Sequence, residues 1–161
     1  MTGVRNYEDL NVWKLSNEIR LRMRPILDRA EFVRHSKLRQ QMEECTERPC
    51  PQIAEGFARY LPGDNAKFVR IAAASLAELL EHLTRARARK LITDHEADDL
   101  RLLARRARGA ANAYIRYLQS AEAPHVEPPP RRRRRRREPN LNPERKGPVS
   151  RPAPSDPNAE P

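Results

Sequence analysis

The sequence is poor in glycine, aromatic residues and cysteine. Glycine provides 5 of the 161 residues and aromatic side chains 5%, and no glycine-rich phosphate-binding loop occurs. The two cysteines, Cys45 and Cys50, lie five positions apart on a predicted helix and lack the two-residue gap of zinc and redox pairs. We therefore expect both thiols to be reduced, with Cys45 in the core.

Long hydrophobic runs are also missing. Residues 1–9 are polar and contain no apolar segment of the kind found in signal peptides. Elsewhere no apolar run approaches the roughly 20 residues that a membrane-spanning helix needs. The sequence therefore predicts a soluble, cytoplasmic protein.

The common catalytic and metal-binding patterns are absent as well. A di-metal helical bundle would need Glu-x-x-His motifs, and none occurs; Glu78 and His82 are four apart, a spacing more typical of a surface contact. Serine is sparse, and there is no nucleophile elbow. We predict no enzymatic activity, no metal and no cofactor. A metal-dependent enzyme would require ligands that meet across subunits.

Positive charge and helix-forming residues are abundant. Lysine and arginine total 32 against 22 acidic residues, which gives a formal net charge of +10. Residues with β-branched side chains are scattered among alanine, leucine, arginine and glutamate, which favour helices. An all-α fold is therefore predicted.

The composition divides the chain near Ala123. Residues 124–161 hold 11 of the 15 prolines and ten of the 32 basic residues, and they have almost no apolar side chains to bury. We predict one folded domain over residues 1–123 and a disordered, proline- and arginine-rich tail over 124–161.

Hydrophobic residues at three- and four-residue steps predict four amphipathic helices, over about 8–28, 34–59, 65–90 and 94–120. Pro49 and Pro51 should kink or break the second helix near 49–51. Asp64 is expected to cap the third helix, and Thr93 and Glu96 have the spacing of a capping box for the fourth. Four such helices with short connections predict an up-down-up-down bundle.

The predicted core follows one stripe on each helix. Three residues of the first helix, Leu10, Trp13 and Leu21, lie off its stripe, and each could pack near Tyr7 or face another subunit. The stripes themselves comprise Val12, Leu15, Ile19, Met23, Ile26 and Leu27; Leu38, Met42, Cys45, Ile53 and Phe57; Phe68, Ala72, Ser75, Leu76, Leu79, Leu83 and Ala86; and Leu100, Leu103, Ala107, Ala111, Tyr114, Ile115 and Leu118.

Two groups of basic residues in the folded domain are candidates for nucleic-acid contact. The first is a stripe under a quarter-turn wide on the fourth helix, which could track phosphates or could be an ordinary solvated face. The second ends the third helix, where its charge would also suit the helix dipole. The first group is Arg101, Arg105, Arg108 and Arg116, and the second is Arg85, Arg87, Arg89 and Lys90.

The tail contains seven consecutive arginines. If all seven engaged a single strand, log affinity would fall against log salt concentration with a slope of about −5. The alternative is that the run expanded by compositional drift. Because the folded domain is also net positive, we favour RNA or DNA as the partner. The run comprises Arg131, Arg132, Arg133, Arg134, Arg135, Arg136 and Arg137.

Three motifs carry a family resemblance. They are residues 7–13 (YEDLNVW), residues 53–59 (IAEGFAR), and Phe68 followed by residues 74–78 (ASLAE). In this order they resemble the four-helix-bundle family of 23S ribosomal RNA intervening-sequence proteins, whose relatives include the accessory variability determinant of diversity-generating retroelements. The resemblance runs from about Tyr7 to Leu118. It departs from the family pattern at residues 48–52, where the prolines are shifted and doubled.

The resemblance implies a left-handed bundle that assembles as a homopentamer and has no enzymatic activity. In the retroelement branch it also implies a basic surface that binds nucleic acid and a reverse transcriptase. Together with the arginine pattern, this predicts a non-enzymatic oligomer that binds RNA or DNA. The competing hypothesis is a structural or protein-interaction module with an incidental basic tail.

Overall fold

The computed structural model describes residues 4–59 and 61–120, and this part of the chain is helical. All described residues belong to one compact unit, Met1–Pro129. The predicted domain boundary at residue 123 and the predicted disordered tail lie outside the described residues. The elements are a short 3₁₀ helix η1 (Tyr7–Asp9) and the helices α1 (Asn11–Leu27), α2 (Ala30–Val33), α3 (Ser36–Glu47), α4 (Pro49–Phe57), α5 (Pro62–Ala88) and α6 (Asp94–Leu118).

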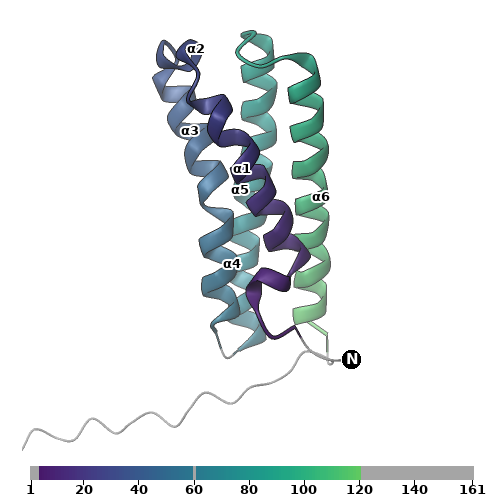
Figure 1. The fold of residues 1–161 in the computed structure, drawn as a ribbon. Helices are drawn as coiled ribbons and strands as arrows, with labels where there is room; N and C mark the ends of the chain where they lie inside the picture. Colours follow the sequence, from purple (N-terminus) through teal and green to yellow (C-terminus); the bar gives the residue numbers. More distant parts are fainter. Residues whose placement is uncertain (1–3, 60, 121–161) are drawn as a thin grey trace, which may run out of the picture. The chain divides into compact units, whose positions relative to one another are not determined.

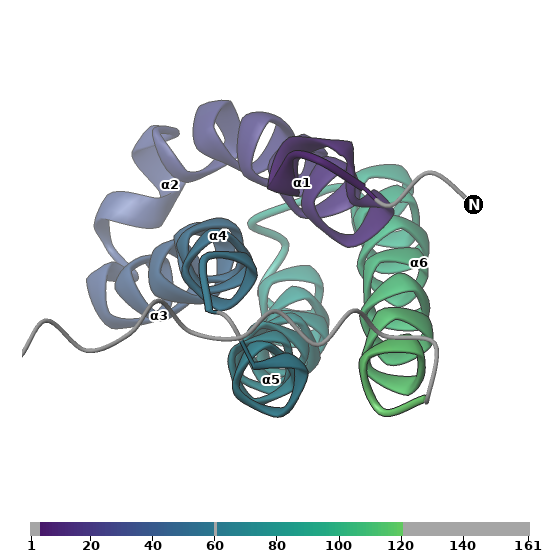
Figure 2. The same ribbon diagram turned by 90° about the horizontal axis from the view of Figure 1, so that it is seen from below.

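The helices form the predicted bundle of four rods. These are α1, the pair α3 and α4, α5, and α6, and successive rods run in opposite directions (Figure 1). Seen from below, they follow one another anticlockwise with α1 pointing away from the viewer, which is the left-handed arrangement (Figure 2). The most extensive contacts join α5 to α6 and α4 to α5, and α1 closes the ring against α6 and α3.

The predicted core stripes are confirmed. Most of their residues are buried, and Leu15, Phe57, Phe68, Tyr114 and Ile115 are half-buried at the edges of the core. The buried side chains form two hydrophobic clusters, one in each half of the bundle. The core therefore runs the full length of the rods.

The three residues off the first stripe have different environments. Leu10 is buried beneath the start of α1, whereas Leu21 is 60% exposed. Trp13 is half-buried, and its ring meets that of Tyr7 edge to face at 5.6 Å between centroids. Packing against Tyr7 therefore explains why Trp13 lies off the core stripe, whereas Leu21 is exposed on the surface.

The region predicted as one kinked helix over 34–59 contains two helices, preceded by the short α2. Arg48 lies between α3 and α4 with helical φ and ψ of −62° and −38°, so the chain continues in nearly the same direction. Pro49 occupies the first position of α4, where a missing amide hydrogen is tolerated. The extra helix α2 was not predicted; its one buried residue, Phe32, is 0% exposed and anchors it to the core.

The start of α5 differs from the prediction. Asp64 does not cap the helix, which already begins at Pro62 after the extended residue Leu61. Proline suits this first position because its φ is fixed and its missing amide hydrogen would have had no partner. Asp64 lies in the first turn and pairs with Lys67, with 2.8 Å between Oδ1 and Nζ.

The third helix also ends two residues earlier than predicted. Lys90 has a φ of +56°, the only positive φ of a non-glycine residue within 4–59 and 61–120. Its amide donates to the Arg87 carbonyl at 2.9 Å, and the Leu91 amide donates to the Ala86 carbonyl at 3.0 Å. These two bonds make a Schellman motif, which ends α5 and buries Leu91.

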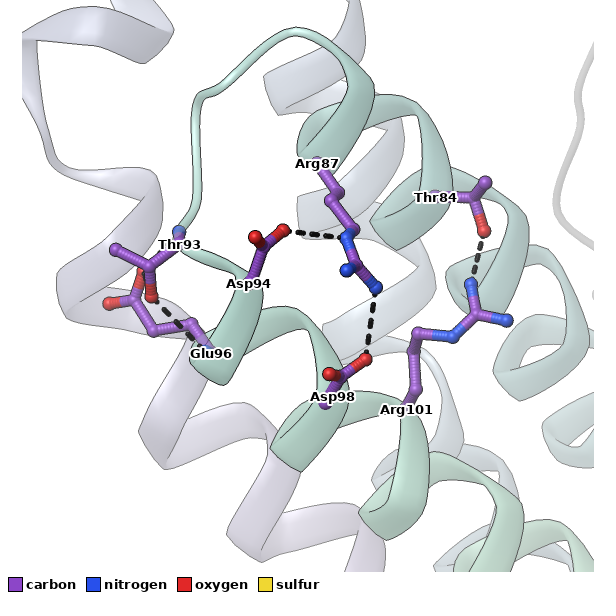
Figure 3. Close-up of polar contacts among 7 residues, drawn as sticks. All are labelled: Thr84, Arg87, Thr93, Asp94, Glu96, Asp98 and Arg101. Carbon is purple, nitrogen blue, oxygen red and sulfur yellow. Dashed lines mark hydrogen bonds and ion pairs between the residues drawn. The ribbon is translucent and has the colours of Figure 1, made fainter.

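The predicted capping box at the start of α6 is confirmed. The Glu96 amide donates to Thr93 Oγ1 at 3.2 Å, and the Thr93 amide donates to Glu96 Oε2 at 2.9 Å. Figure 3 shows this pair at the end of the α5–α6 turn. Arg29, which follows α1, donates to both carboxylate oxygens of Glu96, so the cap also ties α6 to the first half of the chain.

The contact between Arg29 and Glu96 should make the stability of the fold depend on pH in the acid range. The hydrogen bond from Arg29 and the bond from the Thr93 amide lower the pKa of Glu96 to about 2. A carboxylate with a lowered pKa stabilises the fold above its unfolded pKa, and the contribution is lost as pH falls toward 2. We expect Glu96→Gln to lower the free energy of unfolding by about 1.5 kcal/mol at pH 6. Urea titrations at pH 6 and pH 3 should show this difference shrinking; an equal difference at both would contradict the coupling.

Candidate nucleic-acid interface

Beyond Asp99, helix α6 carries positive charge without acidic compensation. Asp99 is the last acidic residue of the helix, and five arginines follow it. Three of them are exposed and two, Arg101 and Arg108, are half-buried. The five are Arg101, Arg105, Arg106, Arg108 and Arg116. Arg106 is also exposed, but it lies about 100° around the helix from Arg105 and so falls outside the stripe.

The arginines of this surface differ in how they are held. Arg101 donates to Thr84 Oγ1 of α5, which fixes its side chain along the α5–α6 seam (Figure 3). Arg105, Arg108 and Arg116 form no hydrogen bond or ion pair with any other residue of the described ranges. We call these three the α6 row. Their guanidinium groups can meet phosphates without first breaking a contact in the bundle.

Arg87 is in the opposite situation. Its Nε lies 2.7 Å from Asp94 Oδ1, and its Nη1 lies 3.0 Å from Asp98 Oδ1 (Figure 3). The pairs join the last turn of α5 to the first turns of α6. A phosphate at Arg87 would have to displace two carboxylates, so this residue has a structural role of its own.

Arg85 and Arg89 lie on the other side of α5, facing α3. Arg85 Nη1 lies 3.5 Å from Gln41 Oε1, and Arg89 Nη1 lies 3.3 Å from His35 Nδ1. Lys90 occupies the left-handed position of the turn. The basic cluster at the end of the third helix is thus divided between two faces, because residues two apart on a helix point about 200° apart.

The run Arg131 to Arg137 lies outside the described residues. Its predicted contact with nucleic acid therefore depends on the sequence alone.

The described residues also bear on redox and metal chemistry. Burial raises the pKa of Cys45 to about 12 and that of Cys50 to about 11, so both thiols are protonated at neutral pH and weak nucleophiles. Cys45 Sγ donates to Glu78 Oε2 at 3.2 Å. Within 4–59 and 61–120, no three His, Cys, Asp or Glu residues gather as a metal site would require. No helix in the same ranges combines the length and apolar character needed to cross a bilayer.

Comparison with known families gives one match. The model of the 23S rRNA-intervening sequence protein family matches residues 8–113. The chain belongs to this family. No curated protein and no solved structure matched the chain. The match confirms the family suggested by the three motifs, and it covers Arg105 and Arg108 of the α6 row, whereas Arg116 and the seven-arginine run lie beyond it.

Proposed function

We propose that this 23S rRNA-intervening sequence family protein is a non-enzymatic, self-associating bundle that binds RNA or DNA. The α6 row and the arginines at 131–137 supply the contacts, and the family resemblance suggests a pentamer. In a retroelement the bundle would act beside a reverse transcriptase. The observation that supports binding is the α6 row itself, three arginines without a carboxylate partner among the described residues, on a helix that has no acidic residue after Asp99.

Unpaired arginines favour nucleic acid for an electrostatic reason. Guanidinium groups that contact phosphates release condensed counterions, and this term supplies most sequence-independent affinity for nucleic acid. Several other exposed arginines are already paired with carboxylates, as in Arg22–Glu18, Arg48–Glu44 and Arg59–Glu55, whereas the α6 row combines within one stripe three arginines that are unpaired in the described part of the chain. The α6 row is therefore the part of the bundle best suited to a polyanion.

The second candidate is a protein-interaction module. Leu102 is 60% exposed and Tyr117 is 41% exposed on α6, beside the arginines. Exposed apolar side chains on one helix favour contact with another protein or another copy. On this alternative, removal of the arginines would leave nucleic-acid affinity unchanged.

A matched pair of triple variants separates the two candidates. Arg105→Gln, Arg108→Gln and Arg116→Gln together should weaken binding to single-stranded RNA about 10- to 100-fold at 0.1 M salt and reduce the salt slope by about 2. The control replaces Arg22, Arg48 and Arg59 by glutamine, which removes the same charge from acid-paired positions. Fluorescence anisotropy across a salt series measures both. Equal losses in the two triple variants would argue against an interface on α6.

A further inference from the structure

A second basic site lies at the end of the bundle where α2 meets α3 and α5 ends. It is a cavity of about 250 Å³, here called the end pocket. Arg34 and Lys37 line it from the α2–α3 connection, and Arg85 and Arg89 line it from the last two turns of α5, with His35 and Ser36 between them. Residues far apart in the sequence thus converge on one hollow.

The charge of the end pocket is entirely positive. Four cationic side chains line it, and no carboxylate does. Glu31 lines an adjoining hollow of about 380 Å³ that shares Arg34, His35 and Arg89 with the end pocket. This contrasts with Arg87, two residues from Arg85 on α5, which is paired to two aspartates. Like charges gathered around a cavity repel one another unless an anion lies among them.

The backbone adds to the same field. Ser36 and Lys37 are the first two residues of α3, a helix of 12 residues, and they line the pocket. The residue before them, His35, makes no side-chain capping bond. The first amide groups of any helix have no intrahelical acceptor, and in α3 they also lack a side-chain cap. The helix dipole is positive at this end. Amides and side chains together offer donors from several directions.

We propose that the end pocket binds the terminal phosphate monoester of a nucleic-acid strand. This inference rests on the proposed function and specifies a second contact for the same ligand. A terminal monoester carries about −1.5 to −2 charges and three strong acceptor oxygens, whereas an internal diester carries one charge. Four cations around a small hollow match the terminal monoester, and the open α6 row matches the internal diesters. The adjoining hollow gives the strand room to leave the pocket.

The test compares three RNA strands of identical sequence, with a 5′-phosphate, with a 3′-phosphate, or with hydroxyl groups at both ends. The full-length protein should bind one phosphorylated strand about tenfold more tightly than the hydroxyl strand, because at least one charge-assisted bidentate contact is added. The double variant Arg34→Gln, Arg89→Gln should lose this preference and keep its affinity for the hydroxyl strand within about threefold. The control Arg22→Gln, Arg48→Gln should keep the preference.

Each other outcome has a defined meaning. Equal affinity for all three strands would overturn the end pocket and leave the proposed function intact, whereas no binding of any strand would overturn both. A preference that persists in the Arg34, Arg89 double variant would also overturn the assignment. If a free nucleoside monophosphate at micromolar concentration abolished the preference, the pocket would belong to a small ligand and the strand-end assignment would be wrong. Circular dichroism of each variant confirms that the helices are retained.

Discussion

Replacing all seven arginines 131–137 by serine is expected to remove most of the salt dependence of nucleic-acid binding. Each arginine that neutralises a phosphate of a single strand contributes about −0.7 to the slope of log affinity against log salt. Seven contacts contribute about −5, so between 50 and 200 mM salt the unmodified protein should lose about 10³-fold more affinity than the serine variant. Anisotropy titrations with one labelled RNA at four salt concentrations give both slopes.

The matched control replaces the same seven arginines by lysine. Lysine keeps the charge, so the slope should stay close to that of the unmodified protein, although lysine cannot make the bidentate contact of arginine. If the serine variant and the unmodified protein had the same slope, the run would be an incidental feature of composition. Binding would then depend on the bundle alone, and the α6 row variants would show the larger effect.

Gly56→Ala is expected to destabilise the bundle by about 1 to 3 kcal/mol. A Cβ atom at Gly56 would lie 2.8 Å from Phe68 Cβ, 2.9 Å from Asn65 Oδ1 and 3.1 Å from the Asn65 carbonyl oxygen. Phe68 Cβ is attached to the backbone of α5 and cannot turn aside. Asn65 is held by its bond to the Tyr114 hydroxyl at 2.9 Å. The variant must therefore push α4 away from α5.

Gly109→Ala provides the matched control. Gly109 lies inside α6, and nothing is within 4 Å of the Cβ that alanine would add. Alanine is favoured over glycine in a helix interior, so this variant should stabilise the protein by about 0.5 to 1 kcal/mol. Chemical denaturation of both variants measures the two changes in the free energy of unfolding, which should have opposite signs. Stabilisation by Gly56→Ala would mean that α4 and α5 are not in close contact at this point.

The sequence was sufficient to predict the helices whose signals are local and repeated. Apolar residues at three- and four-residue steps predicted the buried faces, and the Thr93 and Glu96 spacing predicted the capping box. Each of these features involves residues within one or two turns of each other.

Features that depend on distant residues were not predictable in the same way. The short helix α2 depends on one buried residue, Phe32, because Ala30, Glu31 and Val33 are exposed, so no periodic signal exists there. Helical spacing alone places Arg85 and Arg87 on different faces of α5, but their partners, Gln41 and Asp94, follow only from the fold. The end pocket combines side chains from one side of the end of α5 and from the α2–α3 connection, a grouping that spacing along the chain does not contain.

The turn between α5 and α6 has a consequence for folding kinetics. It joins the two helices with the most extensive mutual contact, and it is defined on one side by the Schellman motif at Lys90 and on the other by the capping box at Thr93. Loop closure over so few residues has a small entropic penalty, so this helical hairpin can form early in the transition state. The contact between α1 and α6 joins the first and the last rod along the chain, so it would form last. A chain with this order of local and distant contacts belongs among the rapidly folding helical proteins.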